Sequence, residues 1–195
     1  LVIIALAAAL AVTLWMSGRL PASIVDRIRS ATEETFATND VRGVNITPEN
    51  YALVERAAHW QAAIAMATAH PWLGIGFGNY EDAYPAYRLI NWEFPLGHAH
   101  NYYLNVLAET GMIGLAAYIV LWLSYLGFAL RLRRNPDPLI RLAAAGLFAT
   151  GVYIGVHSLT DNVYVNNLFL HLGAIMGLLS VLYKQVRIRE IVKTS

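Results

Sequence analysis

Residues 98–123 read "HAHNYYLNVLAETGMIGLAAYIVLWL" and pass without interruption from a histidine- and asparagine-bearing start into apolar sequence. Gly111 to Leu130 comes close to the roughly 20 residues that an α-helix needs to cross the hydrocarbon core of a bilayer. Ionisable groups at the start of such a span lie at the membrane surface, where they act as interfacial anchors or as reactive groups. The stretch therefore predicts a helical membrane protein with a polar site at one rim of the membrane.

The composition is that of a membrane protein. Of the 195 residues, 57% are hydrophobic and only 14% are charged, whereas soluble domains carry about 25% charge. Further apolar stretches at residues 1–16, 142–159 and 168–183 predict an all-α, polytopic protein with about four transmembrane helices, because a helix satisfies its own backbone in lipid. The apolar run at residue 1 has no methionine and no basic flank, as expected of a fragment of a longer polytopic protein. The absence of cysteine excludes disulfide frameworks and thiolate metal sites.

The basic residues predict the orientation of the spans. The connection 131–141 carries four arginines against one aspartate, and the tail 184–195 carries four basic residues. The positive-inside rule assigns both to the cytoplasm. Residues 17–110 then form a large extracytoplasmic loop, which holds six arginines and ten acidic residues and has a net charge of 6 − 10 = −4.

Helical periodicity continues within this loop. Residues 45–70 predict a helix with Thr47 as N-cap and Pro48 at the first helical position. Residues 71–97 are expected to form an irregular loop, in which the three glycines at 74, 76 and 78 make a tight turn or a nest of N–H groups near a phosphate. The predicted apolar face of the helix consists of Leu53, Ala57, Trp60, Ile64 and Ala67. The aromatic residues expected in the headgroup layer are Trp72, Phe77, Tyr80, Tyr84, Tyr87 and Trp92.

A helix that begins near His100 would point this histidine toward the rest of the protein. On a helical wheel Gly111 and Gly114 share its face within about 40°, and small residues let another membrane helix approach closely. Asn105 and Glu109 fall on the opposite side of the wheel, and Asn101 falls between the two faces. His100 is therefore the principal candidate for a functional group.

Two histidines two residues apart, His98 and His100, could share a metal ion. No third ligand of suitable type lies nearby at a helical or hairpin spacing, and zinc usually takes three protein ligands, so no metal is expected. His157 and Asp161 stand four residues apart at the outer end of a span, where they form either a catalytic pair or a polar pair that pins helices together.

Two arginines of the loop are candidates for binding an anion. Arg56 and Arg88 each carry a guanidinium that can hold a phosphate at two points. Each could equally be a solvated surface charge, and the residues alone favour neither.

The motif His100–Asn101, nine residues, Gly111, two residues and Gly114 resembles the signature of the O-antigen ligase and polymerase superfamily. The upstream "HPWLGIGFGNY" at residues 70–80, and Arg56 with Trp60 on the preceding helix, are also similar to that family. The resemblance covers residues 51–118. Some ligases have threonine where this chain has Leu115, so the choice between ligase and polymerase stays open.

The resemblance implies a glycosyltransferase of the GT-C-like, lipid-carrier type that needs neither a metal ion nor a cofactor. It implies that a glycan passes from undecaprenyl diphosphate to lipid A–core, a growing polysaccharide or a protein, at the outer face of the bacterial inner membrane. His100 would be the general base and Arg56 would hold the diphosphate. Expected partners include membrane lipids but no nucleic acid. The other expected substrate-binding residues are Arg88, His98, Asn101, His157 and Asp161.

A transporter or flippase is the alternative outside the enzyme class. Its polar residues would gather near the membrane midplane, whereas those of this chain gather at the ends of the spans.

Overall fold

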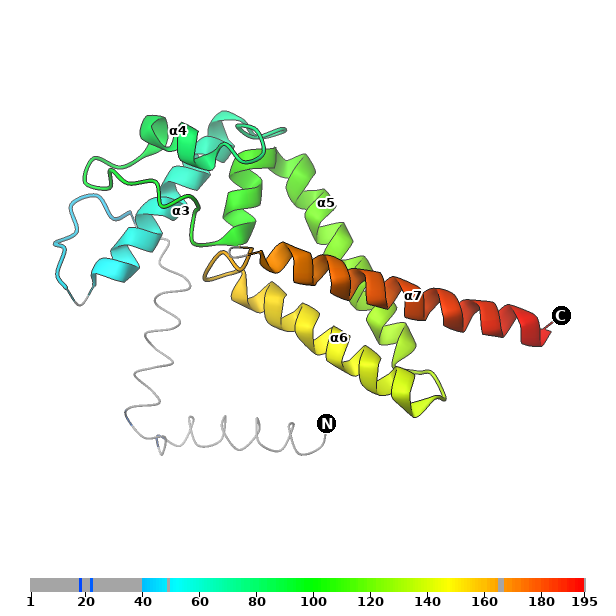
Figure 1. The fold of residues 1–195 in the computed structure, drawn as a ribbon. Coiled ribbons are helices and arrows are strands. Elements are labelled where there is room, and N and C mark those ends of the chain that lie inside the picture. Colours follow the sequence, from blue (N-terminus) through cyan, green and yellow to red (C-terminus); the bar gives the residue numbers. More distant parts are fainter. Residues whose placement is uncertain (1–17, 19–21, 23–39, 49, 165–166, 195) are drawn as a thin grey trace.

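The computed structural model describes residues 40–194 except 49, 165 and 166, together with residues 18 and 22. The described part is helical and contains no strand, as predicted. The expected span at residues 1–16, and most of the segment that follows it up to residue 39, lie outside the described residues. Figure 1 shows the helices α3 (Tyr51–Ala69), α4 (Tyr80–Tyr87), α5 (Tyr102–Leu132), α6 (Pro138–His157) and α7 (Leu168–Thr194).

Three helices are long and apolar enough to cross a membrane: α5, α6 and the part Leu168–Ile188 of α7. The helices extend beyond the ranges expected from hydropathy. Helix α6, for example, begins at Pro138 because the Asp137 carboxylate accepts a hydrogen bond from Leu139 N at 2.9 Å and caps its first turn. The three helices pack through one buried cluster that consists of Trp122, Tyr125, Ala129, Leu132, Ala144, Leu147, Ile154, Leu172 and Leu179.

Helix α5 is sharply bent at Gly111, whose φ of 64° and ψ of −167° are not helical. In Figure 1 a first arm rises to this bend, and a longer second arm descends beside α6 and α7. Tyr102 in the first arm therefore contacts Tyr118 in the second, with 5.5 Å between ring centroids. In a straight helix these residues would stand about 24 Å apart along the axis. The prediction of one continuous helix from His100 onward is thus wrong at Gly111.

The loop between α3 and α4 compensates for the broken helix. A break leaves N–H groups and carbonyls without their intrahelical partners, and such groups are costly to bury unpaired. Here the loop accepts from two N–H groups beyond the bend and donates to two carbonyls before it. The four bonds are Met112 N to Pro71 O (2.8 Å), Ile113 N to Trp72 O (3.3 Å), Ile75 N to Ala108 O (3.0 Å) and Gly76 N to Glu109 O (2.9 Å).

Two glycines make this contact possible. A Cβ on Gly111 would overlap the backbone of Trp72, and a Cβ on Gly74 would overlap the backbone of Thr110. Gly111 thus admits a loop and not a second membrane helix, which corrects the packing role expected for it. The glycines at 74, 76 and 78 all have positive φ and form the expected tight turn, but the N–H groups of residues 75 and 76 bind helix carbonyls rather than a phosphate.

Helix α3 starts later than predicted. Its N-cap is Asn50, and the Asn50 Oδ1 accepts a hydrogen bond from Thr47 N at 2.8 Å, so Thr47 and Pro48 belong to the preceding turn. Ile64, which was expected on the apolar face, is 47% exposed. The face that packs against α4 and the first arm of α5 includes Ala62, Ala63 and Met66.

The region expected to be an irregular aromatic loop contains helix α4. Tyr80 and Tyr84 of this helix are fully buried against α3, and Trp92 is also buried, so these three rings do not face a headgroup layer. Trp72 and Phe77 are exposed, as a position in that layer requires. Tyr80 and Tyr84 instead belong to the core that joins α3, α4 and α5, and Trp92 packs against Val54 and Ala58 of α3.

We predict that Gly111→Ala destabilises the protein by about 2 kcal/mol or more, because its backbone region is almost exclusive to glycine and the added methyl overlaps Trp72. Thermal unfolding in detergent measures the effect. Gly127→Ala in the same helix is the matched control, since its Cβ meets nothing within 4 Å. Equal melting temperatures for the two variants would contradict the assigned role of the bend.

Candidate functional site

The start of α5 is clamped to the connection between α6 and α7. Asn101 caps α5 through its Oδ1, which accepts from Leu104 N at 3.1 Å. Its Nδ2 donates to Leu159 O at 2.9 Å, and Tyr102 N donates to Ser158 O at 2.9 Å. One asparagine side chain thus joins two segments about 60 residues apart, a structural role beside the substrate contact expected for Asn101.

His100 lies just before the helix, not on it. Its φ is 51°, and Asn101 follows as the N-cap, so the helical wheel that placed His100 above Gly111 and Gly114 does not apply. The indole Nε1 of Trp60 donates to His100 O at 3.3 Å and ties this turn to α3. His100 therefore stands where α3, α5 and the α6–α7 connection meet, which is the interior position expected for it, although by a different geometry.

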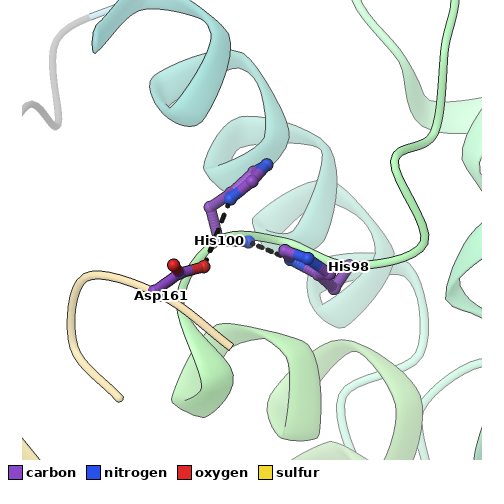
Figure 2. A group of neighbouring side chains, drawn as sticks. All are labelled: His98, His100 and Asp161. Atoms are coloured by element: carbon purple, nitrogen blue, oxygen red, sulfur yellow. Dashed lines mark hydrogen bonds and ion pairs between the residues drawn. The ribbon is translucent and has the colours of Figure 1, made fainter. Parts of the chain in front are cut away.

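Figure 2 shows that His98, His100 and Asp161 come together at this junction. The His100 Nδ1 lies 3.5 Å from the Asp161 Oδ1, and His98 Nδ1 accepts a hydrogen bond from the His100 backbone N–H at 3.2 Å. Although burial opposes it, the backbone N–H of Asn162 and the charge of His100 lower the pKa of Asp161. Burial, followed by the charge of His100, lowers the pKa of His98.

The same three side chains correct the expectation that the two histidines lack a third ligand. One nitrogen from each imidazole and one oxygen of Asp161 lie within 4.8 Å of one another. Asp161 is 61 positions from His100 in the chain, so no local spacing could reveal it.

The expected side-chain pair between His157 and Asp161 does not form. Asp161 is joined to His157 through its backbone N–H, which donates to His157 O at 3.2 Å, while its carboxylate faces His100. The His157 ring stacks on Tyr153, with 5.5 Å between centroids. His157 therefore shapes the turn that presents Asp161, and its ring does not join the cluster.

The two candidate arginines differ in their relation to His100. Arg56 is half-buried and lies one helical turn before Trp60 on α3, on the same side of the helix, and Trp60 contacts His100 directly. Arg88 caps the end of α4 and faces Glu93, with 4.0 Å between Nη1 and Oε1. Arg56 thus lies on the helix that contacts His100, one turn from the contacting residue.

A buried polar network, which the sequence did not reveal, packs against the His100 ring through His59. His59 is 1% exposed and its ring meets the His100 ring edge-on, with 5.7 Å between centroids. It stacks on Tyr84 at 4.8 Å, and its Nδ1 lies 3.2 Å from the Tyr80 hydroxyl, which donates to His59 O. The small residues around His59 in "RAAHWQAA" were the available signal, since they permit close packing.

Asn105 and Glu109 also point inward, contrary to the helical wheel. Asn105 Oδ1 accepts from Ala99 N at 3.1 Å and fixes the turn that carries the histidines. Glu109 Oε1 accepts from Tyr80 N at 3.2 Å and supports the start of α4. Both are buried, because the bend in α5 and the packing of α3 cover the side that a lone span would expose to lipid.

A comparison with known families bears on this arrangement. The model of a family described as O-antigen ligase matches residues 1–119 of the chain, which is more than half of its length. The match includes Arg56, His98, His100 and Asn101, and it ends before Asp161. The chain matches no curated protein.

We predict that His59 makes folding sensitive to acid. Burial, followed by the charges of His100 and His98, lowers its pKa from 6.5 to about 4. The unfolded chain thus takes up a proton at higher pH than the folded one, so stability present above pH 6.5 is lost as the pH falls toward 4, by up to roughly 3 kcal/mol.

Thermal unfolding between pH 8 and pH 4 tests this. His59→Phe keeps a ring against Tyr84 but cannot titrate, so its melting temperature should fall less steeply across this range. His70→Phe, at an exposed histidine, should retain the wild-type slope. A wild-type slope in the His59 variant would show that other groups cause the acid sensitivity.

Proposed function

This chain belongs to the O-antigen ligase family, and from that membership we propose that it transfers a glycan from undecaprenyl diphosphate to an acceptor hydroxyl. Membership of the family implies a lipid-linked saccharide and an acceptor as substrates in general. The observation that carries the finer proposal is the pairing of His100 with Asp161, at a junction reached by the helix that bears Arg56. The proposed acceptors are lipid A–core, a growing polysaccharide or a protein.

His100 is the proposed general base. With Asp161 facing Nδ1, the proton of a neutral imidazole belongs on that nitrogen, and Nε2 keeps the lone pair. Among the described residues the Nε2 atom has no hydrogen-bond partner. It is shielded from solvent in this arrangement, so the ring must turn to meet the acceptor, and catalytic contacts commonly tighten only when substrate is present.

The proposed reaction is a single displacement. The acceptor hydroxyl gives its proton to His100 while its oxygen bonds to the anomeric carbon of the glycan. The bond from that carbon to the diphosphate breaks, and the electron pair leaves with the diphosphate. Asp161 stabilises the imidazolium that forms, and Arg56 stabilises the negative charge that develops on the leaving group.

The proposed displacement needs no metal ion, because a guanidinium supplies the cationic clamp and an imidazole supplies the base. A lipid-borne donor also accounts for the place of the cluster. The three helices that could cross a membrane support His100 and Asp161 at one end, where a lipid headgroup would lie. With the charge bias of the connections, this supports an active site on the extracytoplasmic side of the inner membrane.

We predict that His100→Ala reduces glycan transfer by about 10² to 10⁴-fold, the usual contribution of a positioned base. Asp161→Asn should cause a smaller loss, roughly tenfold, because its half-exposed carboxylate interacts through a partly screened field. Transfer by the full-length protein in detergent, scored by glycan banding on a gel, measures both. His70→Ala is the control for an exposed histidine. Wild-type transfer by His100→Ala would refute the assignment.

Arg56→Lys should lower transfer by about tenfold, because lysine keeps the charge but loses the two-point contact with phosphate. The same banding assay measures the effect. Arg42→Lys is the matched control, since Arg42 lies in the same predicted extracytoplasmic loop as Arg56, is exposed and pairs with Asp40. If Arg88→Lys impairs transfer and Arg56→Lys does not, the diphosphate clamp is Arg88.

A further inference from the structure

We propose that His98, His100 and Asp161 bind a first-row transition-metal dication, best matched by Zn²⁺, and that this ion inhibits transfer. The binding is independent of the proposed function, whereas the inhibition rests on it. The ion is an inhibitor of the site and takes no part in the reaction.

The donor set fits such an ion. Two imidazoles and one carboxylate are the ligands of many zinc sites that keep a fourth position for water, and imidazole also suits Ni²⁺ and Cu²⁺. Mg²⁺ and Ca²⁺ need six or more ligands, mostly oxygen, and the cluster offers the carboxylate of one residue. Two neutral imidazoles with one carboxylate leave a single net positive charge on the complex, which a half-exposed site can accommodate.

The distances are close to those required. The ligand atoms lie within 4.8 Å of one another, and tetrahedral zinc with bonds near 2.0 Å sets them about 3.3 Å apart. The side chains are partly exposed, so small rotations can close the difference. Coordination through the Nδ1 of His98 would replace the hydrogen bond that this atom accepts from the His100 N–H.

The backbone assembles the ligands before any ion arrives. Figure 2 shows the two histidines on one turn and Asp161 on a separate segment beside it. The bonds from Asn101 to Leu159 and from Tyr102 to Ser158 hold these segments together. A site preassembled in this way loses little conformational entropy on binding.

Occupancy would remove the base. A neutral imidazole has one lone pair, so a metal bound at the His100 Nδ1, the atom that faces Asp161, leaves the proton on Nε2 and no lone pair to accept the acceptor's proton. The metal also draws Asp161 away from stabilising the imidazolium. We therefore expect Zn²⁺ to inhibit transfer and a chelator to restore it, since the proposed reaction itself needs no metal.

The test measures binding of Zn²⁺ alone to the purified full-length protein by titration calorimetry, with Co²⁺ absorption as a second reading of the coordination geometry. His98→Ala and Asp161→Asn should each weaken Zn²⁺ binding by roughly 100-fold. Loss of a residue that only supports a ligand weakens metal binding by about 10- to 100-fold, and loss of a ligand itself should cost at least as much. His70→Ala should bind as the wild type does. Asp161→Asn is isosteric and lies at a half-exposed position, so it serves even if His98→Ala fails to fold.

Transfer assays with Zn²⁺ and then EDTA complete the experiment. Binding that depends on His98 and Asp161, with inhibition reversed by EDTA, supports the proposal. Failure to bind Zn²⁺, or binding unchanged in both variants, overturns the proposed metal site. The role of His100 as the base is then judged separately, from glycan transfer by His100→Ala. Binding without inhibition supports the metal site, but it overturns the inhibition and contradicts His100 as the base.

Discussion

The hydrogen-bonded contact between the loop 71–76 and the bend in α5 is the constraint on which the arrangement depends. Four backbone bonds replace those that the broken helix loses, and each buried group left unpaired would cost about 1–3 kcal/mol. Because the loop satisfies them, α5 can fold back on itself. That reversal returns the start of the helix to the level of Ser158, where Tyr102 N donates to its carbonyl, and so brings His100 beside Asp161.

Backbone groups, more than side-chain packing, therefore set the geometry of the cluster. His100 is held by the Trp60 indole at its carbonyl, and Asp161 is held by the bond of its own N–H to His157 O. Asn101 joins the two turns. The main chains of His100 and Asp161 are thus fixed, while their side chains stay partly exposed. A site that must be both precise and accessible to substrate requires this combination.

The sequence predicted the helical class and the three apolar helices at residues 102–188, because hydropathy is a local property. Motif spacing singled out His100, whose role as a base stays a prediction. The sequence did not predict the bend at Gly111, since glycine also fits a straight membrane helix and its four replacement bonds come from residues 33 to 41 positions earlier. The helical wheel placed Asn105 and Glu109 on the wrong side because it assumed a straight helix that no other segment covers. Asp161 and His59 reach His100 from other segments, and contacts at such separations leave no periodic signal in one sequence.

Three imidazoles crowd this junction, and their surroundings separate their roles. His59 is buried among rings, which lowers its pKa to about 4, and burial also lowers the pKa of His98. A proton is therefore disfavoured on both. Among the three, His100 makes the ion-pair contact with Asp161, with 3.5 Å between its Nδ1 and the Asp161 Oδ1. The imidazole proposed as the base is thus the one that the fold sets against Asp161, while its two neighbours shape the space around it.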